Sequence, residues 1–352
     1  MDRRRFLIGG TAAIALAGPA FAQTRSGPSF AFDAMGEVRF EYDDALIRAM
    51  QASGITAVTV TLCDPKVYED EAYRTALEAV RAHDAHFAAR PDLFLKATSV
   101  ADLDRARDSG RIAIFYLFQN TTQFGRDLDR VDRFHDLGVR SAQITYNDQN
   151  WAGSGCKEIG ANGLTLFGRE LIGRMNARRM LIDLSHANMK TMADAIAASR
   201  VPVIVSHTGC MAVHANDRNT TDENLRALAD RGGVVGICQI RPFLTDRREG
   251  ALDAYFAHIA HAVKVAGVDH LGIGSDRDHR VIEMTPEYIA ELKREQGPNF
   301  NDADWPLFID QLNGPRRMEV IRNGLRTRGM AAADVDKIMG GNVRRIYEEV
   351  IG

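Results

Sequence analysis

Met180-Leu-Ile-Asp-Leu-Ser-His186 is a short, mostly apolar run that ends in a histidine. Two later stretches have the same form, Val201-Pro-Val-Ile-Val-Ser-His207 and His270-Leu-Gly-Ile-Gly-Ser-Asp276. Buried parallel strands appear in a sequence as short continuous apolar runs. In a (β/α)8 barrel, the residues at the carboxyl ends of such strands carry the chemistry. We therefore expect two imidazoles and one carboxylate to meet on one rim of a barrel.

Eight segments of this kind can be counted, and amphipathic helical patterns separate most of them. The strand candidates span residues 30–35, 55–62, 111–119, 139–146, 180–186, 201–207, 233–239 and 270–276. The helical patterns include residues 44–52, 164–178, 189–199 and 252–265. Alternation of strands with helices is typical of parallel α/β folds. The sequence thus predicts an α/β, TIM-like (β/α)8 barrel, with a doubly wound sheet as the lesser alternative.

Two connections and the tail are longer than a minimal barrel needs. Residues 65–107 follow the second strand and are expected to hold two extra helices, and residues 277–315 follow the eighth strand. Both leave the carboxyl rim, where long loops cover substrates. Residues 316–351 are expected to form a helical C-terminal segment.

The amino terminus has the pattern of an export signal. Arg3-Arg-Arg-Phe-Leu7 precedes an uncharged stretch, residues 8–21, and a small-x-small cleavage site at Ala20-Phe-Ala22. These features predict a twin-arginine-type signal peptide over residues 1–22 and a single mature domain over residues 23–352. A permanent helix needs about 20 apolar residues, so a membrane anchor is the weaker alternative. We expect the protein to work in the periplasm.

Composition excludes several classes of partner. The chain has 352 residues and a formal net charge of −3, with acids and bases interspersed. Without a basic stripe or a second apolar segment, we expect no nucleic-acid partner and no permanent membrane span. A homodimer stays open. Four cysteines, Cys63, Cys156, Cys210 and Cys238, are compatible with disulfides in an oxidising compartment and equally with buried thiols.

Most of the residues at or just beyond the eight strand ends have polar or ionisable side chains. The full set is Met35 with Glu37, Asp64, Gln119, Tyr146, His186, His207, Gln239 and Asp276. Imidazole nitrogen with carboxylate oxygen suits zinc best among the common ions. Asp276 is then a ligand, a proton shuttle, or both. Asp183 is expected either to orient His186 or to bind a backbone amide.

Three further residues allow two interpretations each. His214 and His279 fall in rim loops, where they either line a pocket or, more commonly for such positions, are solvated. Trp151, just past the fourth strand, either walls the pocket or caps the barrel.

At these positions the chain resembles the membrane (renal-type) dipeptidases, zinc peptidases on a barrel of the metal-dependent hydrolase type. The matching stretches are residues 163–170, 180–186, 206–207, 217–220, 271–276 and 340–345. The resemblance implies that His186 and His207 hold one Zn(2+), while Asp276 serves the other zinc and proton transfer. It also implies that Arg218 binds the terminal carboxylate of a small dipeptide-like substrate, whose peptide bond is cleaved by metal-activated water. A surface arginine is the weaker alternative at Arg218.

The chain departs from the family pattern at four positions. The first strand normally carries a His-x-Asp metal-binding pair, and Met35 and Glu37 stand there instead. Gln119 replaces a glutamate that bridges both ions, and Tyr146 replaces a histidine that touches substrate. Two divalent ions repel by roughly 17–19 kcal/mol at an effective dielectric near 20, and a neutral amide offsets little of this. We therefore expect one ion or two, with the first weak or absent and the second held by His186 and His207, where Asp276 or Gln119 and water complete its coordination.

The sequence leaves three functions to weigh. The first is an exported, zinc-dependent, dipeptidase-like hydrolase, in which Glu37 and Gln119 are the further metal-ligand candidates. The second is a tautomerase or isomerase in periplasmic metabolism, in which Tyr146 and Asp276 exchange protons. The third is a binding protein that has lost hydrolysis.

Overall fold

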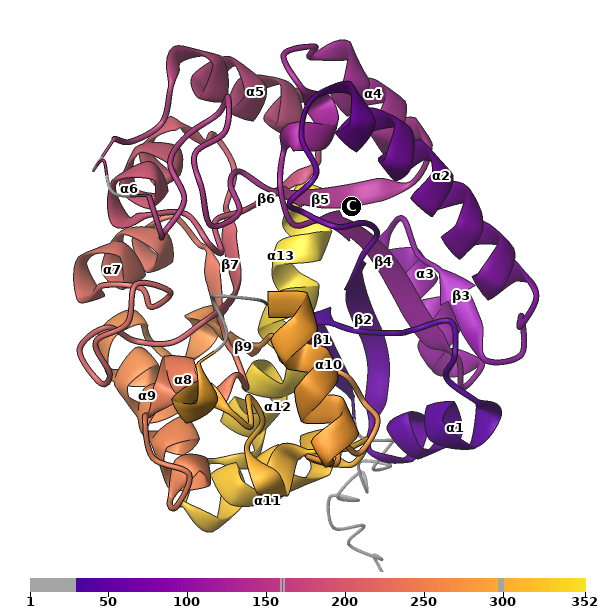
Figure 1. The fold of residues 1–352 in the computed structure, drawn as a ribbon, viewed down its shortest axis with the longest axis vertical. Coiled ribbons are helices and arrows are strands. Elements are labelled where there is room, and N and C mark those ends of the chain that lie inside the picture. Colours follow the sequence, from indigo (N-terminus) through magenta and orange to yellow (C-terminus); the bar gives the residue numbers. More distant parts are fainter. Residues whose placement is uncertain (1–29, 159, 161, 297–300) are drawn as a thin grey trace, which may run out of the picture.

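The eight predicted strands all form in this computed structural model, which describes residues 30–158, 160, 162–296 and 301–352. They are β1 (Ala31–Gly36), β2 (Ile55–Thr61), β4 (Ile112–Phe118), β5 (Val139–Gln143), β6 (Leu181–Asp183), β7 (Ile204–Thr208), β8 (Val234–Ile237) and β9 (Leu271–Ile273). Their order is β2-β1-β9-β8-β7-β6-β5-β4, and parallel pairing of β2 with β4 closes the ring. The fold is thus a closed eight-stranded parallel barrel, as predicted (Figure 1).

A ninth strand, β3 (Phe94–Lys96), was not predicted from the sequence. It lies in the long connection after β2, between α2 (Glu69–Ala88) and α3 (Val100–Asp108), the two helices expected there. It pairs with the first residues of β4, whereas β5 pairs with the later ones. Three residues are too few to show a periodic pattern, which explains the omission.

Helices surround the barrel (Figure 1). The remaining ones are α1 (Asp44–Ala52), α4 (Asp129–Asp136), α5 (Leu166–Ala177), α6 (Met189–Ala198), α7 (Asp222–Asp230), α8 (Arg241–Leu244), α9 (Ala251–Ala266), α10 (Pro286–Gln296), α11 (Arg317–Thr327), α12 (Ala332–Asp336) and α13 (Asn342–Val350). Capping side chains fix several starts. The carboxylate of Asp43 accepts from the Leu46 amide before α1, and Asn188 accepts from the Thr191 amide before α6. Each cap satisfies a backbone donor that the first helical turn leaves free.

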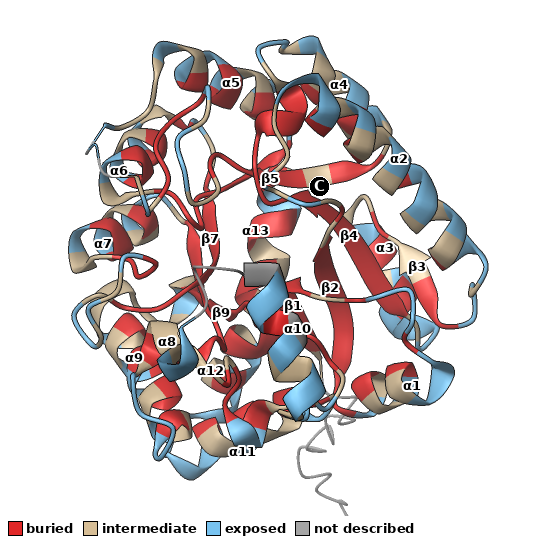
Figure 2. Cartoon of the chain, viewed as in Figure 1, coloured by how far each residue is buried: buried red, intermediate tan, exposed pale blue. Residues whose placement is uncertain are grey.

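The strands are buried along nearly their whole length, which is why they read as apolar runs (Figure 2). One end of the barrel is filled by aromatic packing. Phe32 of β1 and Phe115 of β4 pack against Tyr347 of α13, with ring centroids 4.9 and 4.8 Å from the tyrosine ring. The Tyr347 hydroxyl also lies 2.6 Å from Thr59 Oγ1 of β2. This packing fixes α13 against the barrel interior.

The structure bears on the disulfide alternative and on the predicted absence of a membrane span. The four cysteines are all free, so the disulfide alternative is wrong for this structure. Within the described ranges, no helix is long and apolar enough to cross a membrane. Residues 1–22, the predicted signal peptide, lie outside the described residues, so that assignment stays a prediction.

Candidate active site

Two histidines from neighbouring strands meet at the carboxyl ends of β6 and β7. His186 lies three residues past β6 and His207 lies within β7. Their Nε2 atoms are 3.0 Å apart, and both side chains are buried. His186 has φ 66°, in the left-handed region that non-glycine residues seldom adopt. The sequence prediction that these two imidazoles converge is therefore matched by the geometry.

Each imidazole is oriented through its other nitrogen. Nδ1 of His186 lies 2.7 Å from Asn147 Oδ1, an atom that only accepts hydrogen bonds. Nδ1 of His207 lies 2.8 Å from Ser206 Oγ, and that hydroxyl donates to Asp183 Oδ2 at 2.5 Å. Since the serine proton goes to the carboxylate, the serine oxygen accepts from Nδ1–H. Both Nδ1 atoms are thus donors, and both Nε2 atoms carry lone pairs.

The local charge balance keeps the two rings neutral. Burial, and secondly the positive charge of Arg218, hold the pKa of His186 and His207 well below the usual histidine value. The Nε2 lone pairs of the two neutral imidazoles face each other 3.0 Å apart. They repel each other unless a cation binds to both. Zinc binds imidazole nitrogen at about 2.0–2.1 Å, so this donor pair fits two ligands of one ion.

The other predicted ligands do not form a second metal site. The Gln119 amide donates to the sulfur of Met35 at 3.6 Å, so these two side chains satisfy each other. The Glu37 carboxylate accepts from the guanidinium of Arg39. Across the described ranges, no group of three or more His, Cys, Asp and Glu side chains is gathered as a metal site would require. Among these residues the predicted ligand set of His186, His207 and Asp276 is therefore not gathered as one group, and the two imidazoles remain the pair that could hold an ion.

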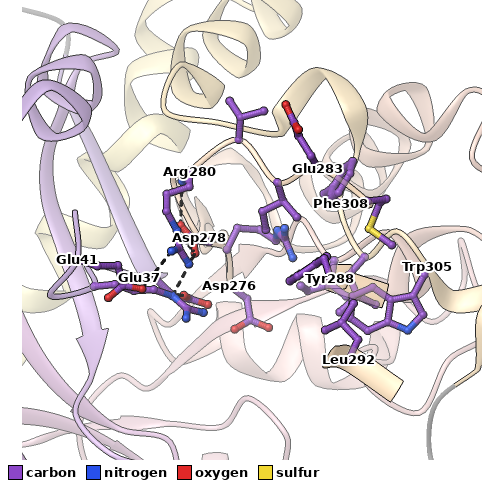
Figure 3. Close-up of a pocket in the computed structure, with 17 residues that line it drawn as sticks. Glu37, Glu41, Asp276, Asp278, Arg280, Glu283, Tyr288, Leu292, Trp305 and Phe308 are labelled. Atoms are coloured by element: carbon purple, nitrogen blue, oxygen red, sulfur yellow. Dashed lines mark hydrogen bonds and ion pairs between the residues drawn. The ribbon is translucent and has the colours of Figure 1, made fainter. Parts of the chain in front are cut away.

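Asp276 lies at the floor of a cavity of about 730 Å³. It follows β9, has φ 53°, and its backbone amide donates to Met35 O at 2.8 Å. Burial raises the pKa of its carboxyl to about 7, although the charge of Arg218 opposes the shift. A carboxyl with this pKa exchanges protons readily near neutrality. In Figure 3 its carboxylate lies between a charged group of side chains and an aromatic one.

Arg218 and Tyr146 border the imidazoles. The arginine is 4% exposed, so the surface alternative is wrong. Its Nη2 donates to the backbone oxygen of His207 at 3.4 Å, and its Nε has no hydrogen-bond partner among the described residues. The ring of Tyr146 stacks on that of His186 with centroids 4.1 Å apart. Burial raises the pKa of its phenol to about 12, so the hydroxyl is protonated at neutral pH.

Two close backbone approaches hold this region together. A side-chain carbon at Gly274 would lie 1.7 Å from Ser206 O, and one at Gly236 would lie 2.0 Å from the same oxygen. Only glycine allows β8 and β9 to come this near to the end of β7. The position of His207 therefore depends on Gly236 in β8 and on Gly274, one residue past β9.

Several expectations need correction. For Asp183 the backbone-amide alternative is confirmed, since its Oδ1 accepts from the amides of Ser185 and Ser206. The other alternative is wrong, because Asn147 rather than Asp183 orients His186. Burial contradicts the solvated interpretation of His279, which has no exposed surface.

The two other rim residues considered from the sequence, His214 and Trp151, are partly exposed and lie outside the cavity. His214 is partly exposed, and its Nε2 lies 3.6 Å from Asp246. Trp151 is 46% exposed with Arg126 over its ring, and it does not line the cavity. Asn147 lies four residues past the end of β5, and its position directly after Tyr146, the end of the predicted strand, was the only sequence signal for it.

Comparison with known proteins finds relatives of one family. The family model described as membrane dipeptidase (peptidase family M19) matches residues 30–294. An uncharacterised dipeptidase of Schizosaccharomyces pombe is 34% identical over 53% of this chain and 46% of its own length. The dipeptidase tcpJ of Claviceps purpurea is 30% identical over 71% of this chain and 53% of its own length. The matches to these two curated relatives thus span only about half of each relative.

Solved structures show the same fold. A crystal structure of an amidohydrolase from Pseudomonas aeruginosa superimposes with a TM-score of 0.79 at 28% sequence identity. The match covers 92% of this chain and 97% of that one.

Proposed function

The chain belongs to the membrane dipeptidase family, peptidase family M19, and we propose that it is a zinc-dependent hydrolase of a dipeptide-like amide with one metal ion. The family supports hydrolysis of this kind, and the proposal adds the metal number, the substrate and the residue roles. The observation that carries it is the pair of Nε2 lone pairs, 3.0 Å apart, on His186 and His207. Zinc bound there would lower the pKa of water and polarise a carbonyl.

The remaining roles follow from the surroundings of each side chain. Arg218 binds the terminal carboxylate of the substrate, because its buried guanidinium has an unpartnered Nε and presents planar donors. Asp276 accepts and returns a proton, because its pKa of about 7 lets both forms exist at neutral pH. Tyr146 donates a hydrogen bond to substrate, because its phenol keeps its proton. Glu37 and Gln119 contact Arg39 and Met35, so we assign them no ligand role.

Metal analysis with matched histidine variants tests the proposal. We expect one zinc per chain in protein purified without chelator, and dipeptide hydrolysis that stops on zinc removal and returns on its addition. His186→Ala and His207→Ala should each lose both zinc and activity. His214→Ala, a rim histidine paired with Asp246, is the control and should keep both. Absence of zinc, or activity indifferent to its removal, would refute the proposal.

A tautomerase is the second candidate, because Asp276 titrates near neutrality and interacts electrostatically with Tyr146. A tautomerase would exchange a carbon-bound hydrogen of the substrate for deuterium from the solvent, and this exchange would persist in zinc-free protein. Hydrolysis instead incorporates oxygen from labelled water into the product carboxylate. Mass spectrometry of the same reaction separates the two outcomes. Substrate binding without either change would indicate the third alternative, a binding protein.

A further inference from the structure

The cavity above Asp276 has two chemically different halves (Figure 3). One half is charged and internally paired. Asp278 binds Tyr42 and Arg280, and Glu37 binds Arg39. These contacts neutralise most of the charge on that wall.

The other half is mostly apolar and comes from the long connection after β9, together with Ile240. Two charged residues also lie there: the guanidinium of Arg277 is 5.9 Å from the centroid of the Phe308 ring, and Glu283 lies beside Phe308 (Figure 3). The apolar lining residues of this half are Ile240, Val281, Ile282, Met284, Tyr288, Leu292, Trp305, Leu307 and Phe308. Tyr288 and Leu292 lie on α10, and Figure 3 shows both beside Trp305 and Phe308. A cavity of about 730 Å³ falls within the range of sites for ligands of drug size. A dipeptide of two small residues would leave the apolar half without contact.

The orientation of a substrate follows from the residues that do and do not line this cavity. Asp276 lines it, whereas His186, His207 and Arg218 do not. A substrate whose carboxylate is held by Arg218 therefore reaches the cavity with its amino-terminal part, past Asp276. This step rests on the proposed function.

We propose that the apolar half is a subsite for a large aromatic side chain on the amino-terminal residue of the substrate. Aromatic rings gain from edge and face contacts with other rings in addition to the area they bury. Tyr288, Trp305 and Phe308 offer such contacts, and Leu292 and Met284 complete the wall. The preferred substrates are dipeptide-like amides with a bulky aromatic group before the scissile bond.

Intrinsic fluorescence can test this without relying on catalysis. The chain has two tryptophans, and only Trp305 lines the cavity. In zinc-loaded Trp151→Phe protein, rapid mixing reports binding of Phe-Ala before turnover, and competition of Ala-Phe or Ala-Ala with Phe-Ala gives their affinities. We expect Phe-Ala to bind at least tenfold more tightly than Ala-Ala and more tightly than Ala-Phe. Equal affinities, or a preference for Ala-Phe, would overturn the inference.

A second pair of variants links the preference to the wall. In the same background, Tyr288→Ala should reduce the preference for Phe-Ala to within threefold, and Tyr288→Phe should keep it. Leu166→Ala, at an exposed position at the start of α5, is the control and should keep it as well. A preference unchanged in Tyr288→Ala would overturn the inference.

Failure of the two proposals can be told apart in these data. Tighter binding of Phe-Ala without hydrolysis of any dipeptide would contradict the proposed function and leave the subsite in place. Hydrolysis with equal affinity for all three dipeptides would do the reverse.

Discussion

Gln119 Nε2 donates a hydrogen bond to the sulfur of Met35 at 3.6 Å, across the first and third strands of the barrel proper. These are the positions where the family resemblance leads one to expect a metal-binding histidine and a bridging glutamate. A thioether and a neutral amide that bind each other offer neither the negative charge nor the hard oxygen or nitrogen ligands that a second divalent ion needs.

Restoring those two side chains should create a second metal site. In the Met35→His, Gln119→Glu double variant, we expect zinc content to rise from one to two ions per chain. Dipeptide hydrolysis should rise with it, because a second ion adds charge stabilisation at the reacting bond. Elemental analysis and kcat/KM are the measurements, and the two single variants are the controls. A double variant that still binds one ion would show that Met35 and Gln119 are not what limits metal number.

The contacts behind the two imidazoles should set zinc affinity. Asn147→Ala and Ser206→Ala each remove the partner that fixes an Nδ1–H, so we expect zinc affinity to fall about 10–100-fold. Competition with a chromogenic chelator measures this. Asn323→Ala, on the exposed face of α11, is the matched control. An unchanged affinity in both variants would contradict the tautomer assignment.

Arg218 should act on the substrate carboxylate alone. Charge-assisted hydrogen bonds contribute about 1.5–3 kcal/mol, so Arg218→Met should raise KM for a free dipeptide about 10–100-fold. The same dipeptide with an amidated carboxyl terminus should be hydrolysed equally poorly by both proteins. A selective loss on the free acid supports the assignment, whereas equal losses on both substrates would place the arginine elsewhere in the reaction.

Asp33 should make the fold less stable as pH rises. Burial raises its folded pKa to about 6, and a bond from the Ser275 amide opposes this only in part. The unfolded chain loses the proton first, so stability should fall by about 2–3 kcal/mol between pH 4 and 7. Urea unfolding should show this drift, and Asp33→Asn should reduce it, while Asp276, whose pKa burial also raises, keeps its own contribution. Asp310→Asn, an exposed carboxylate, should leave it unchanged.

Export should depend on the arginines at the amino terminus, which lie outside the described residues. We expect Arg3→Lys, Arg4→Lys protein to accumulate in the cytoplasm when expressed in a bacterium with a twin-arginine pathway. Fractionation followed by immunoblotting measures this, and Arg25→Lys, beyond the predicted cleavage site, is the control. Unimpaired export of the double variant would indicate another route.

Much of the barrel was predictable because its strands are buried on both faces. Apolar runs such as those before His186 and His207 mark strand ends, and strand ends share a rim. The family resemblance added Arg218. The partners of the imidazoles were not predictable: Asn147 lies in the connection after β5, and Ser206 precedes His207 within β7 without any pattern that shows where its hydroxyl bonds. The buried state of His279 depends on packing against distant segments, which one sequence does not reveal.

Asp183 accepts four hydrogen bonds, from the amide and hydroxyl of Ser185 and of Ser206. One carboxylate thereby joins the turn after one strand to the next strand, and it also sets the proton on a neighbouring imidazole. Replacing it would lower the amount of intact protein in a cell and disable whatever survives. A screen that measures only total activity in cells would therefore record one defect for a substitution at Asp183, although both protein amount and site chemistry had changed.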